Sequence, residues 1–507
     1  MLEGIGQGFA VALEWQNLLY CFAGVLLGTV LGVLPGIGPV AGIALLLPAT
    51  YGLHPASAII MMAGIFYGTM YGGSTTSILI NVPGEASSVI TCLEGYQMAR
   101  RGRAGPALGI AAIGSFIAGT IGVVGLMLAA PPLARLALAF GPPEYSALIV
   151  FGLVVLAFLS SGSTLRALAM GAFGLLLGTI GLEPISGFAR FTFGVPELFD
   201  GIGFIPVAMG LFGLGEILDK AARAGSAEVV RARLTHLLPS RSDWARSWRA
   251  ILRGTGIGFL CGLLPGPNAV IASIVSYGTE KRLARHPEEF GRGAIEGVAG
   301  PESANNAAAA GALVPLFTLG LPSSPPTAVL LAGFLIHGLT PGPLLMQQRP
   351  DVFWGVLASM YIGNAMLLVL NLPLIGVFVR ILRIPDVYLL PAVVLFCMVG
   401  AYSVGNSLAD VWVMVLFGLV GFACRRGGFD TAPVVLALVL GPVLETALRQ
   451  ALILSDGSPA IFVTRPIAAA FLAAAAALIV WNLVAVRRGR MARTLAADPT
   501  GGARCSD

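Results

Sequence analysis

Two long apolar segments of this chain are each interrupted by a Pro-Gly pair. Pro35-Gly36 ends the run Gly-Val-Leu-Pro-Gly, and Pro265-Gly266 ends the run Gly-Leu-Leu-Pro-Gly 230 positions later. Proline lacks an N–H and glycine adds no packing surface, so each pair should stop or unwind a helix. Backbone groups freed inside a bilayer are costly unless partners satisfy them. Matched interruptions in two halves of a membrane protein are typical of a transporter binding site.

The composition predicts a membrane protein. The chain is 56% hydrophobic and 11% charged, with a mean hydropathy of +0.87, whereas soluble domains are about 45–50% apolar and about 25% charged. Its 507 residues leave room for about 10–14 membrane segments of about 20 residues each. We therefore expect an all-α polytopic membrane protein with broken helices and two re-entrant hairpins.

Other protein classes are disfavoured by the same composition. The net charge of +5 arises from residues between apolar segments, where the positive-inside rule explains them, so no nucleic-acid partner is expected. Six scattered cysteines and four histidines form no CxxC or HExxH pattern, which predicts neither a disulfide framework nor a zinc site. No cofactor is expected beyond a coupling ion, Na⁺ or H⁺. Membrane lipids are expected to surround the protein.

The polar stretches divide the chain into two halves. The expected units are residues 1–218 as the first transmembrane half, 219–250 as a basic cytoplasmic linker, 251–486 as the second transmembrane half and 487–507 as a cytoplasmic tail. Crossings are expected, among others, at Trp15–Leu34, Ala107–Leu128, Tyr145–Leu159, Val352–Leu372 and Val411–Ala423. Basic residues after the last apolar segment place the C-terminus in the cytoplasm.

The similarity between the halves extends beyond the Pro-Gly pairs. Ile80–Gly84 has a counterpart in Leu319–Ser323, 239 positions later. The register therefore drifts by nine residues, which we attribute to an insertion at Glu280–Arg292. The two halves are interpreted as internal repeats, and we expect them to be inverted. Inversion requires an odd number of crossings between them, a number that the sequence leaves open.

A small polar run in the first half is a candidate anion site. Apolar arms flank Gly72, Gly73, Ser74, Thr75, Thr76 and Ser77, a pattern typical of a re-entrant hairpin with a polar tip. Hydroxyls, bare amides and a helix start suit an anion. The substrate-binding candidates are this run with Asn81, and Pro322, Ser323 and Ser324 at the second tip. The alternative for the first run is small-residue helix packing.

The second half contributes the ionisable candidate. Glu302, Asn305 and Asn306 lie in a segment otherwise rich in small residues, and ionisable groups at membrane depth are usually functional. Together with backbone oxygens at Gly36 and Gly266, they are the predicted ion-coordinating residues. The alternative for Glu302 is a helix-start cap just after Pro301. The first half would then hold more of the anion site and the second more of the ion site.

Nearby polar residues are given a structural interpretation. Glu85–Glu94, with Tyr96 and Arg100, is predicted to lie at the membrane interface. His54 and His337 are isolated residues next to expected helix ends and are predicted to be structural.

Several motifs resemble one known family. They are Gly32–Pro39, Tyr67–Ser74, Ile80–Gly84, Glu94–Ala99, Glu296–Asn306, Leu319–Pro322 and Gly338–Pro343. The chain is similar through nearly its whole length to the large membrane subunit of the tripartite tricarboxylate transporters. It departs from the family at Ser323-Ser324, where a glycine commonly follows the proline.

The resemblance implies a function and partners. The chain would be a multi-pass secondary active importer in the bacterial inner membrane. It would work with a small membrane subunit and a periplasmic solute-binding protein that delivers an organic carboxylate. Uptake would be driven by Na⁺ or H⁺, as symport, through an elevator-like movement. No P-loop occurs in the chain, so no ATP site is expected.

Two other classes of function remain as alternatives. An intramembrane serine hydrolase would use Ser74 with His337 as its base, but no third orienting group is evident and such an enzyme has no need of a repeat. A passive anion channel would need a continuous polar stripe, whereas the polar residues gather at two tips. Accumulation that stops when an ion gradient is collapsed separates a symporter from both. The carboxylate and the coupling ion are not readable from the sequence.

Overall fold

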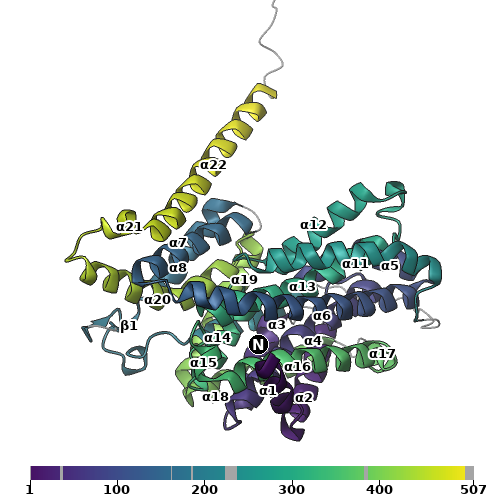
Figure 1. The fold of residues 1–507 in the computed structure, drawn as a ribbon, viewed down its shortest axis with the longest axis horizontal. Helices are drawn as coiled ribbons and strands as arrows, with labels where there is room; N and C mark the ends of the chain where they lie inside the picture. Colours follow the sequence, from purple (N-terminus) through teal and green to yellow (C-terminus); the bar gives the residue numbers. More distant parts are fainter. Residues whose placement is uncertain are drawn as a thin grey trace, which may run out of the picture.

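The computed structural model describes residues 2–34, 38–160, 163–183, 186–222, 237–381 and 386–496, and these are almost entirely helical (Figure 1). In this part of the chain seven helices are long and apolar enough to cross a membrane, which confirms the all-α polytopic class. They are α2 (Trp15–Val33), α4 (Pro55–Ile80), α6 (Ala104–Ala137), α7 (Pro142–Leu159), α16 (Pro350–Asn371), α19 (Leu408–Gly427) and α20 (Ala432–Leu454). The five crossings listed above coincide with α2, α6, α7, α16 and α19.

Shorter elements connect and flank these helices. The remaining helices are α1 (Leu2–Ala12), α3 (Pro39–Leu46), η1 (Leu47–Thr50), η2 (Ala86–Ser88), α5 (Val89–Arg100), α8 (Thr164–Gly178), η3 (Pro196–Leu198), α9 (Phe204–Ala208), η4 (Met209–Leu214), α10 (Gly215–Ala222), α11 (Arg241–Gly262), α12 (Asn268–Leu283), η5 (Pro287–Glu289), α13 (Glu296–Leu319), α14 (Pro325–Ile336), α15 (Leu345–Gln348), α17 (Ile375–Ile381), α18 (Asp386–Gly405), α21 (Ile461–Thr464) and α22 (Pro466–Ala496). Two antiparallel two-residue strands, β1 (Gly181–Leu182) and β2 (Ala189–Arg190), form a small sheet.

Glycines allow two helix pairs to pack at backbone distance. Gly24, Gly28 and Gly32 of α2 face the carbonyl oxygens of Met61, Ile65 and Thr69 in α4, and Gly254, Gly258 and Gly262 of α11 face those of Gly300, Ala304 and Ala308 in α13. A Cβ at any of these six glycines would overlap the facing oxygen. Small residues spaced by four are the usual means of such close packing in membranes.

The Pro265-Gly266 pair interrupts its helix as predicted. α11 ends at Gly262 and α12 begins at Asn268, and Gly266 has a φ of +141° that favours glycine. Its N–H donates to the Ser323 carbonyl at 2.7 Å, so the break is joined to the turn before α14. In the first half, α2 ends at Val33 and α3 begins at Pro39. Pro35 and Gly36, the latter a predicted ion ligand, lie outside the described residues, as do residues 223–236 of the expected linker.

The predicted polar tip at Gly72–Ser77 is wrong, because α4 continues through it as one helix to Ile80. α4 is buried from Ala56 to Ile80, so its polar groups can find partners only inside the protein. The hydroxyls of Thr76 and Ser77 donate to the Gly73 carbonyl at 2.9 and 3.0 Å, within their own helix. The turn comes later, at Asn81, whose φ is +56°.

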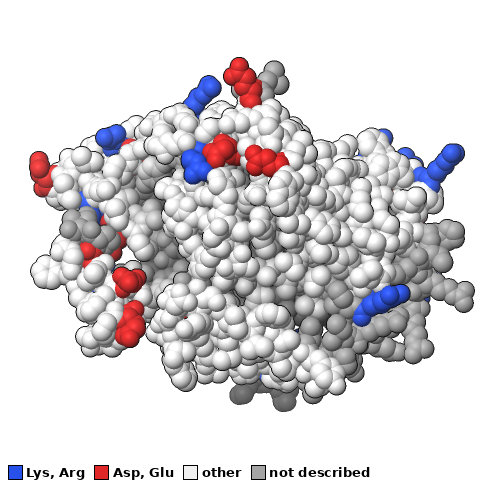
Figure 2. Space-filling view, turned by 90° about the horizontal axis from the view of Figure 1, so that it is seen from below, with Lys and Arg blue, Asp and Glu red and all other residues white. Residues whose placement is uncertain are grey.

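The second predicted tip does lie in a turn. α13 ends at Leu319, Gly320 has a φ of +70°, and α14 begins at Pro325, so Pro322–Ser324 connect the two helices. Charged side chains are sparse on the face shown in Figure 2, where they lie along the margins around a broad uncharged middle. This distribution suits a surface in contact with lipid.

Candidate functional site

A fully buried carboxyl group lies where α4, α5 and α13 meet. The Ser74 hydroxyl donates to Glu302 Oε2 at 2.5 Å, and the Thr91 hydroxyl donates to Oε1. Asn305 Nδ2 donates to Oε2 at 3.2 Å. Glu302 is 0% exposed, and no Lys or Arg pairs with it within the part of the chain that the structure describes. Three neutral donors from three helices therefore hold one buried acid.

Asn306 extends this cluster to α6. Its Nδ2 donates to Asn305 Oδ1 at 2.7 Å and to Ser115 Oγ at 2.8 Å. The Ser115 hydroxyl donates in turn to the Glu302 carbonyl at 3.3 Å. The predicted residues Ser74, Glu302, Asn305 and Asn306 are thus brought together, although they come from both halves of the chain.

The local sequence of α13 explains how this arrangement forms. Positions three and four apart lie on the same face of a helix, so Asn305 and Asn306 lie one turn beyond Glu302. α13 begins at Glu296 and runs through Pro301. Glu302 therefore lies inside the helix, and the alternative of a helix-start cap is wrong.

A second polar bridge joins α4 to α16 and α6. Tyr71 donates its hydroxyl proton to Asn364 Oδ1 at 2.5 Å. Asn364 Nδ2 donates to the Phe116 carbonyl at 2.7 Å and to Thr120 Oγ1 at 3.0 Å. The sequence interpretation missed Tyr71, Thr91, Ser115 and Asn364. The only local signal for each was the polarity of its side chain.

The other predicted substrate residues lie apart from Glu302. Gly72 packs against the Thr29 carbonyl, and Gly73 lies beside Glu85. At the second turn, the Ser323 hydroxyl donates to the Gly262 carbonyl at 3.3 Å. Ser324 forms a capping box with Thr327. Among the described residues, no hydrogen bond joins Pro322–Ser324 to Glu302, Asn305 or Asn306.

A separate acidic residue, Glu94, has a structural environment. Its carboxylate accepts from the Tyr277 hydroxyl at 2.7 Å and from the N–H groups of Gly293 at 2.7 Å, Ala294 at 2.9 Å and Gly291. α5 is thereby tied to the segment that precedes α13. A carboxylate with this many donors needs no ligand to satisfy it.

Comparisons with known proteins identify the family. The model of the tripartite tricarboxylate transporter TctA family matches residues 18–436. The chain belongs to this family. It is a multi-pass membrane protein of a transporter family, and the family is that of a three-component system with a small membrane partner and a periplasmic binding partner.

The similar curated proteins come from Agrobacterium vitis. An uncharacterized 52.8 kDa protein in the TAR-I ttuC' 3'region is 51% identical over 484 residues, which cover 96% of each chain. An uncharacterized protein in the TAR-II ttuC' 3'region is 51% identical over 215 residues, which cover 42% of this chain and 89% of that protein. No solved structure matches the chain.

Proposed function

We propose that this chain is the large permease subunit of a binding-protein-dependent system that takes up an organic carboxylate, a tricarboxylate or a related acid, by ion-coupled secondary transport. The small membrane subunit and the periplasmic solute-binding protein are its partners, and the bacterial inner membrane is its location. Family membership supports the transport class. The environment of Glu302 supports the ion coupling.

The proposal that transport is coupled to an ion rests on the environment of Glu302. A buried carboxylate is costly unless a positive charge accompanies it. Among the described residues no basic side chain pairs with Glu302, and its three donors, from Ser74, Thr91 and Asn305, are neutral. A bound proton or metal cation would supply the missing charge. A site that holds this proton or cation would allow the carboxylate to be taken up together with it.

The packing of the two helix pairs supports the proposal of two related halves. The three close-packed glycines of α2 precede those of α11 by 230 positions, and their partners in α4 precede those in α13 by 239. The same 239 positions separate Asn81 and Gly320, both left-handed residues that end a helix. We interpret the α2–α4 and α11–α13 units as inverted repeats, each ending in a turn at a left-handed residue, in a body that moves like an elevator.

The arrangement of basic residues supports an orientation in the membrane. Arg103, just before α6, pairs with Asp243 at the start of α11. The loop after α5 and the start of α11 therefore share one end of the molecule. By the loop-charge rule this end, with its arginines, faces the cytoplasm. The periplasmic binding protein would deliver the carboxylate at the opposite end.

Uptake assays test the function. Cells or proteoliposomes with all three components should accumulate a labelled carboxylate only while an ion gradient exists. Ser74→Ala and Asn305→Ala should abolish uptake while the protein still assembles in the membrane. Comparison of Na⁺ with choline buffer, and of uptake with and without a proton ionophore, identifies the ion. Normal uptake by both variants, or accumulation without any gradient, would contradict the proposal.

The serine hydrolase alternative lacks support in the geometry. The Ser74 hydroxyl faces an acid rather than a histidine. His337 Nε2 lies 3.0 Å from Thr50 Oγ1, and no contact between His337 and Ser74 is found among the described residues. A passive anion channel would be indicated instead if flux persisted after collapse of every ion gradient.

A further inference from the structure

A small polar cavity lies beside the Glu302 cluster, between α4, α6 and α16. Its volume of about 10 Å³ is close to the space that one water-sized particle needs. The cavity is lined by Tyr71, Ser74 and Thr75 of α4, Leu108, Ala111, Ala112 and Ser115 of α6, and Asn371 of α16. Ser74 and Ser115 belong at the same time to the Glu302 cluster.

Three hydroxyls around this cavity already use their protons elsewhere. Tyr71 donates to Asn364 Oδ1 at 2.5 Å, Ser74 to Glu302 Oε2 at 2.5 Å, and Ser115 to the Glu302 carbonyl at 3.3 Å. A hydroxyl has one proton and two lone pairs. These residues can therefore offer the cavity only lone pairs, which attract a cation or the hydrogens of a donor.

Asn371 adds an acceptor that has no partner. Its Nδ2 donates to the Leu367 carbonyl at 3.0 Å. Among the described residues no donor reaches its buried Oδ1, and Asn371 is 3% exposed. An unsatisfied buried acceptor is costly, and in a native protein it calls for an explanation such as an ion. The oxygen belongs to a residue that lines the cavity.

We propose that this cavity is a Na⁺ site, with Asn371 Oδ1 and the hydroxyl oxygens of Ser74, Thr75 and Ser115 as ligands. The inference rests on the proposed function and identifies its coupling ion. Ser74 links the site to the carboxylate, because its proton is directed to Glu302 and its lone pairs remain for the cation. The Glu302 carboxylate then offsets the charge of the bound cation.

The ligand types agree with this ion. Hard oxygen ligands suit alkali and alkaline-earth cations, but divalent Ca²⁺ and Mg²⁺ usually take carboxylates directly. Across the described residues no group of three or more His, Cys, Asp or Glu side chains gathers to hold a metal ion. Both carboxylate oxygens of Glu302 and the amide of Asn305 already take part in hydrogen bonds of the cluster. We therefore place the ion in the adjacent cavity and not in the predicted Glu302–Asn306 cluster.

Thermal unfolding of the purified full-length protein in nanodiscs tests the site directly. The melting temperature of the wild type should rise saturably when NaCl replaces choline chloride at constant ionic strength, because a ligand that binds only the folded state stabilises it. Asn371→Leu should raise the half-saturating Na⁺ concentration at least tenfold. In choline it should melt no lower than the wild type, because it loses an unsatisfied oxygen. Asn371→Asp should keep the Na⁺ response.

Two further variants secure the interpretation. Ser359→Ala is the matched control, because Ser359 is buried in α16, the helix that contains Asn371. Its hydroxyl donates to the Val356 carbonyl at 2.7 Å, and it does not line the cavity. It should respond to Na⁺ like the wild type. Thr75→Val removes a second ligand and should weaken the response if Asn371→Leu does not fold.

The outcomes separate this site from the proposed function. A wild type that choline and Na⁺ stabilise equally would overturn the Na⁺ site, and so would an Asn371→Leu protein with wild-type half-saturation, which would indicate a bound water. In either case, gradient-driven carboxylate uptake would leave the transport function standing. A Na⁺ response that depends on Asn371 without any carboxylate uptake would leave the site standing and refute the function.

Discussion

Thr91 approaches Glu302 from the opposite side to Ser74. It lies on α5 and donates to Oε1, whereas Ser74 on α4 donates to Oε2. Along the chain, α4 and α5 are connected by the turn after Asn81 and η2. The Thr91 hydrogen bond therefore ties α5 to the buried acid of α13.

Thr91→Val keeps the side-chain shape and removes this donor. A hydrogen bond to a charged group contributes about 1.5–3 kcal/mol, so we expect carboxylate uptake to fall by about 10- to 150-fold. Thr91→Ser retains the hydroxyl and is the control, with uptake expected within a few-fold of the wild type. Initial uptake rates, normalised to the amount of protein in the membrane, measure the effect. Equal rates for the valine and serine variants would show that the hydroxyl has no part in transport.

At the scale of elements, the α11–α13 contact depends on the absence of side chains. Gly258 faces the Ala304 carbonyl so closely that a Cβ would overlap it, whereas Gly256, two residues away on α11, has open space around its Cβ position. Both glycines lie inside the same helix, so a change to alanine brings each the same gain in helix propensity, about 1 kcal/mol. The pair of substitutions thus isolates the packing of the two helices.

Gly258→Ala should destabilise the protein, because overpacking of a close contact typically costs about 1–3 kcal/mol and a carbonyl oxygen cannot rotate away as a side chain can. Gly256→Ala should leave stability unchanged or raise it slightly. Thermal unfolding in detergent, followed by the loss of monodisperse protein in gel filtration, compares the two. The packing argument fails if Gly258→Ala melts at or above the temperature of Gly256→Ala.

The sequence predicted the elements better than the contacts between them. Apolar runs of crossing length located α2, α6, α7 and α16, because burial in lipid needs only length and hydrophobicity. Gly72–Ser77 was misassigned to a tip because its composition suits a loop, whereas inside a protein the same small residues let α2 and α4 pack closely. Thr91, Ser115 and Asn364 were missed because their meeting with Glu302 or Tyr71 is a property of tertiary packing.

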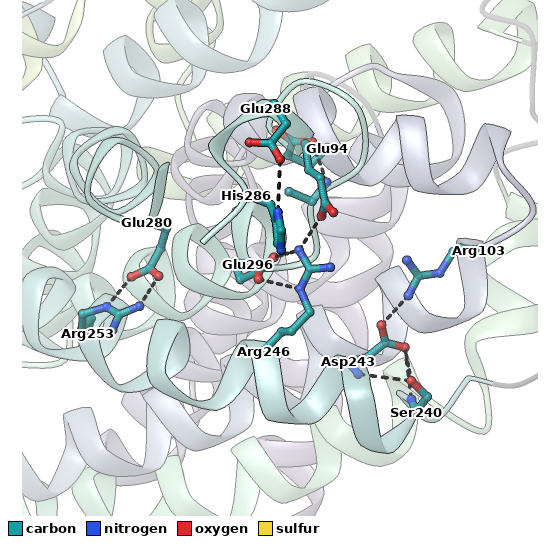
Figure 3. A network of polar contacts seen from close by, with 12 residues as sticks. Glu94, Arg103, Ser240, Asp243, Arg246, Arg253, Glu280, His286, Glu288 and Glu296 are labelled. Carbon is teal, nitrogen blue, oxygen red and sulfur yellow. Dashed lines mark hydrogen bonds and ion pairs between the residues drawn. The ribbon is translucent and has the colours of Figure 1, made fainter. Parts of the chain in front are cut away.

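For the whole molecule, ion pairs at one end hold several helices together. Arg246 of α11 bonds to Glu296 at the start of α13 and to Glu289, and Arg253 of α11 bonds to Glu280 of α12. Figure 3 shows these pairs with the Arg103–Asp243 pair and Glu94 around the same end of the helices. The interactions fasten α5, α11, α12 and α13 into one body, as an elevator-like movement of that body would require.

Asp243 makes this end sensitive to acid. Burial raises the pKa of its carboxyl group, but hydrogen bonds from Ser240 and Arg103 outweigh that effect, and the net pKa is lowered. A group with a lowered pKa stabilises the folded state above its unfolded pKa, about 3.9, and this contribution is lost as the pH falls through the folded pKa. Stability from Asp243 should thus be constant from pH 7 to about pH 5 and decline below about pH 4.

Arg103→Gln should make this decline smaller, because it removes one of the interactions that lower the pKa of Asp243 and so brings the folded pKa closer to the unfolded value. Unfolding at a series of pH values, with the Asp243→Asn variant as the control that lacks the titrating group, measures the difference. The stability of the Arg103→Gln protein should depend on pH differently from that of the wild type. In the Asp243→Asn background, addition of Arg103→Gln should leave the pH dependence of stability unchanged. An identical pH profile for all three proteins would contradict the role of the pair.

The two arginines of α11 should differ in importance, although each makes a bidentate ion pair. Arg246 bonds to partly exposed carboxylates, whose side chains are 44% and 15% exposed, whereas Glu280, the partner of Arg253, is 1% exposed. Exposed pairs contribute about 0–1 kcal/mol. Removal of Arg253 strands the charge of the buried Glu280 and should cost more, but less than the about 3–5 kcal/mol of a fully buried pair, because Arg253 itself is 37% exposed. Arg253→Ala should therefore lower the melting temperature well below that of Arg246→Ala.

Addition of Glu280→Gln to Arg253→Ala should restore part of the loss, since it removes the stranded charge but keeps the side-chain volume. If the two single variants melt together, or if Glu280→Gln gives no recovery, the end of the molecule is held by packing and the ion pairs are incidental to it.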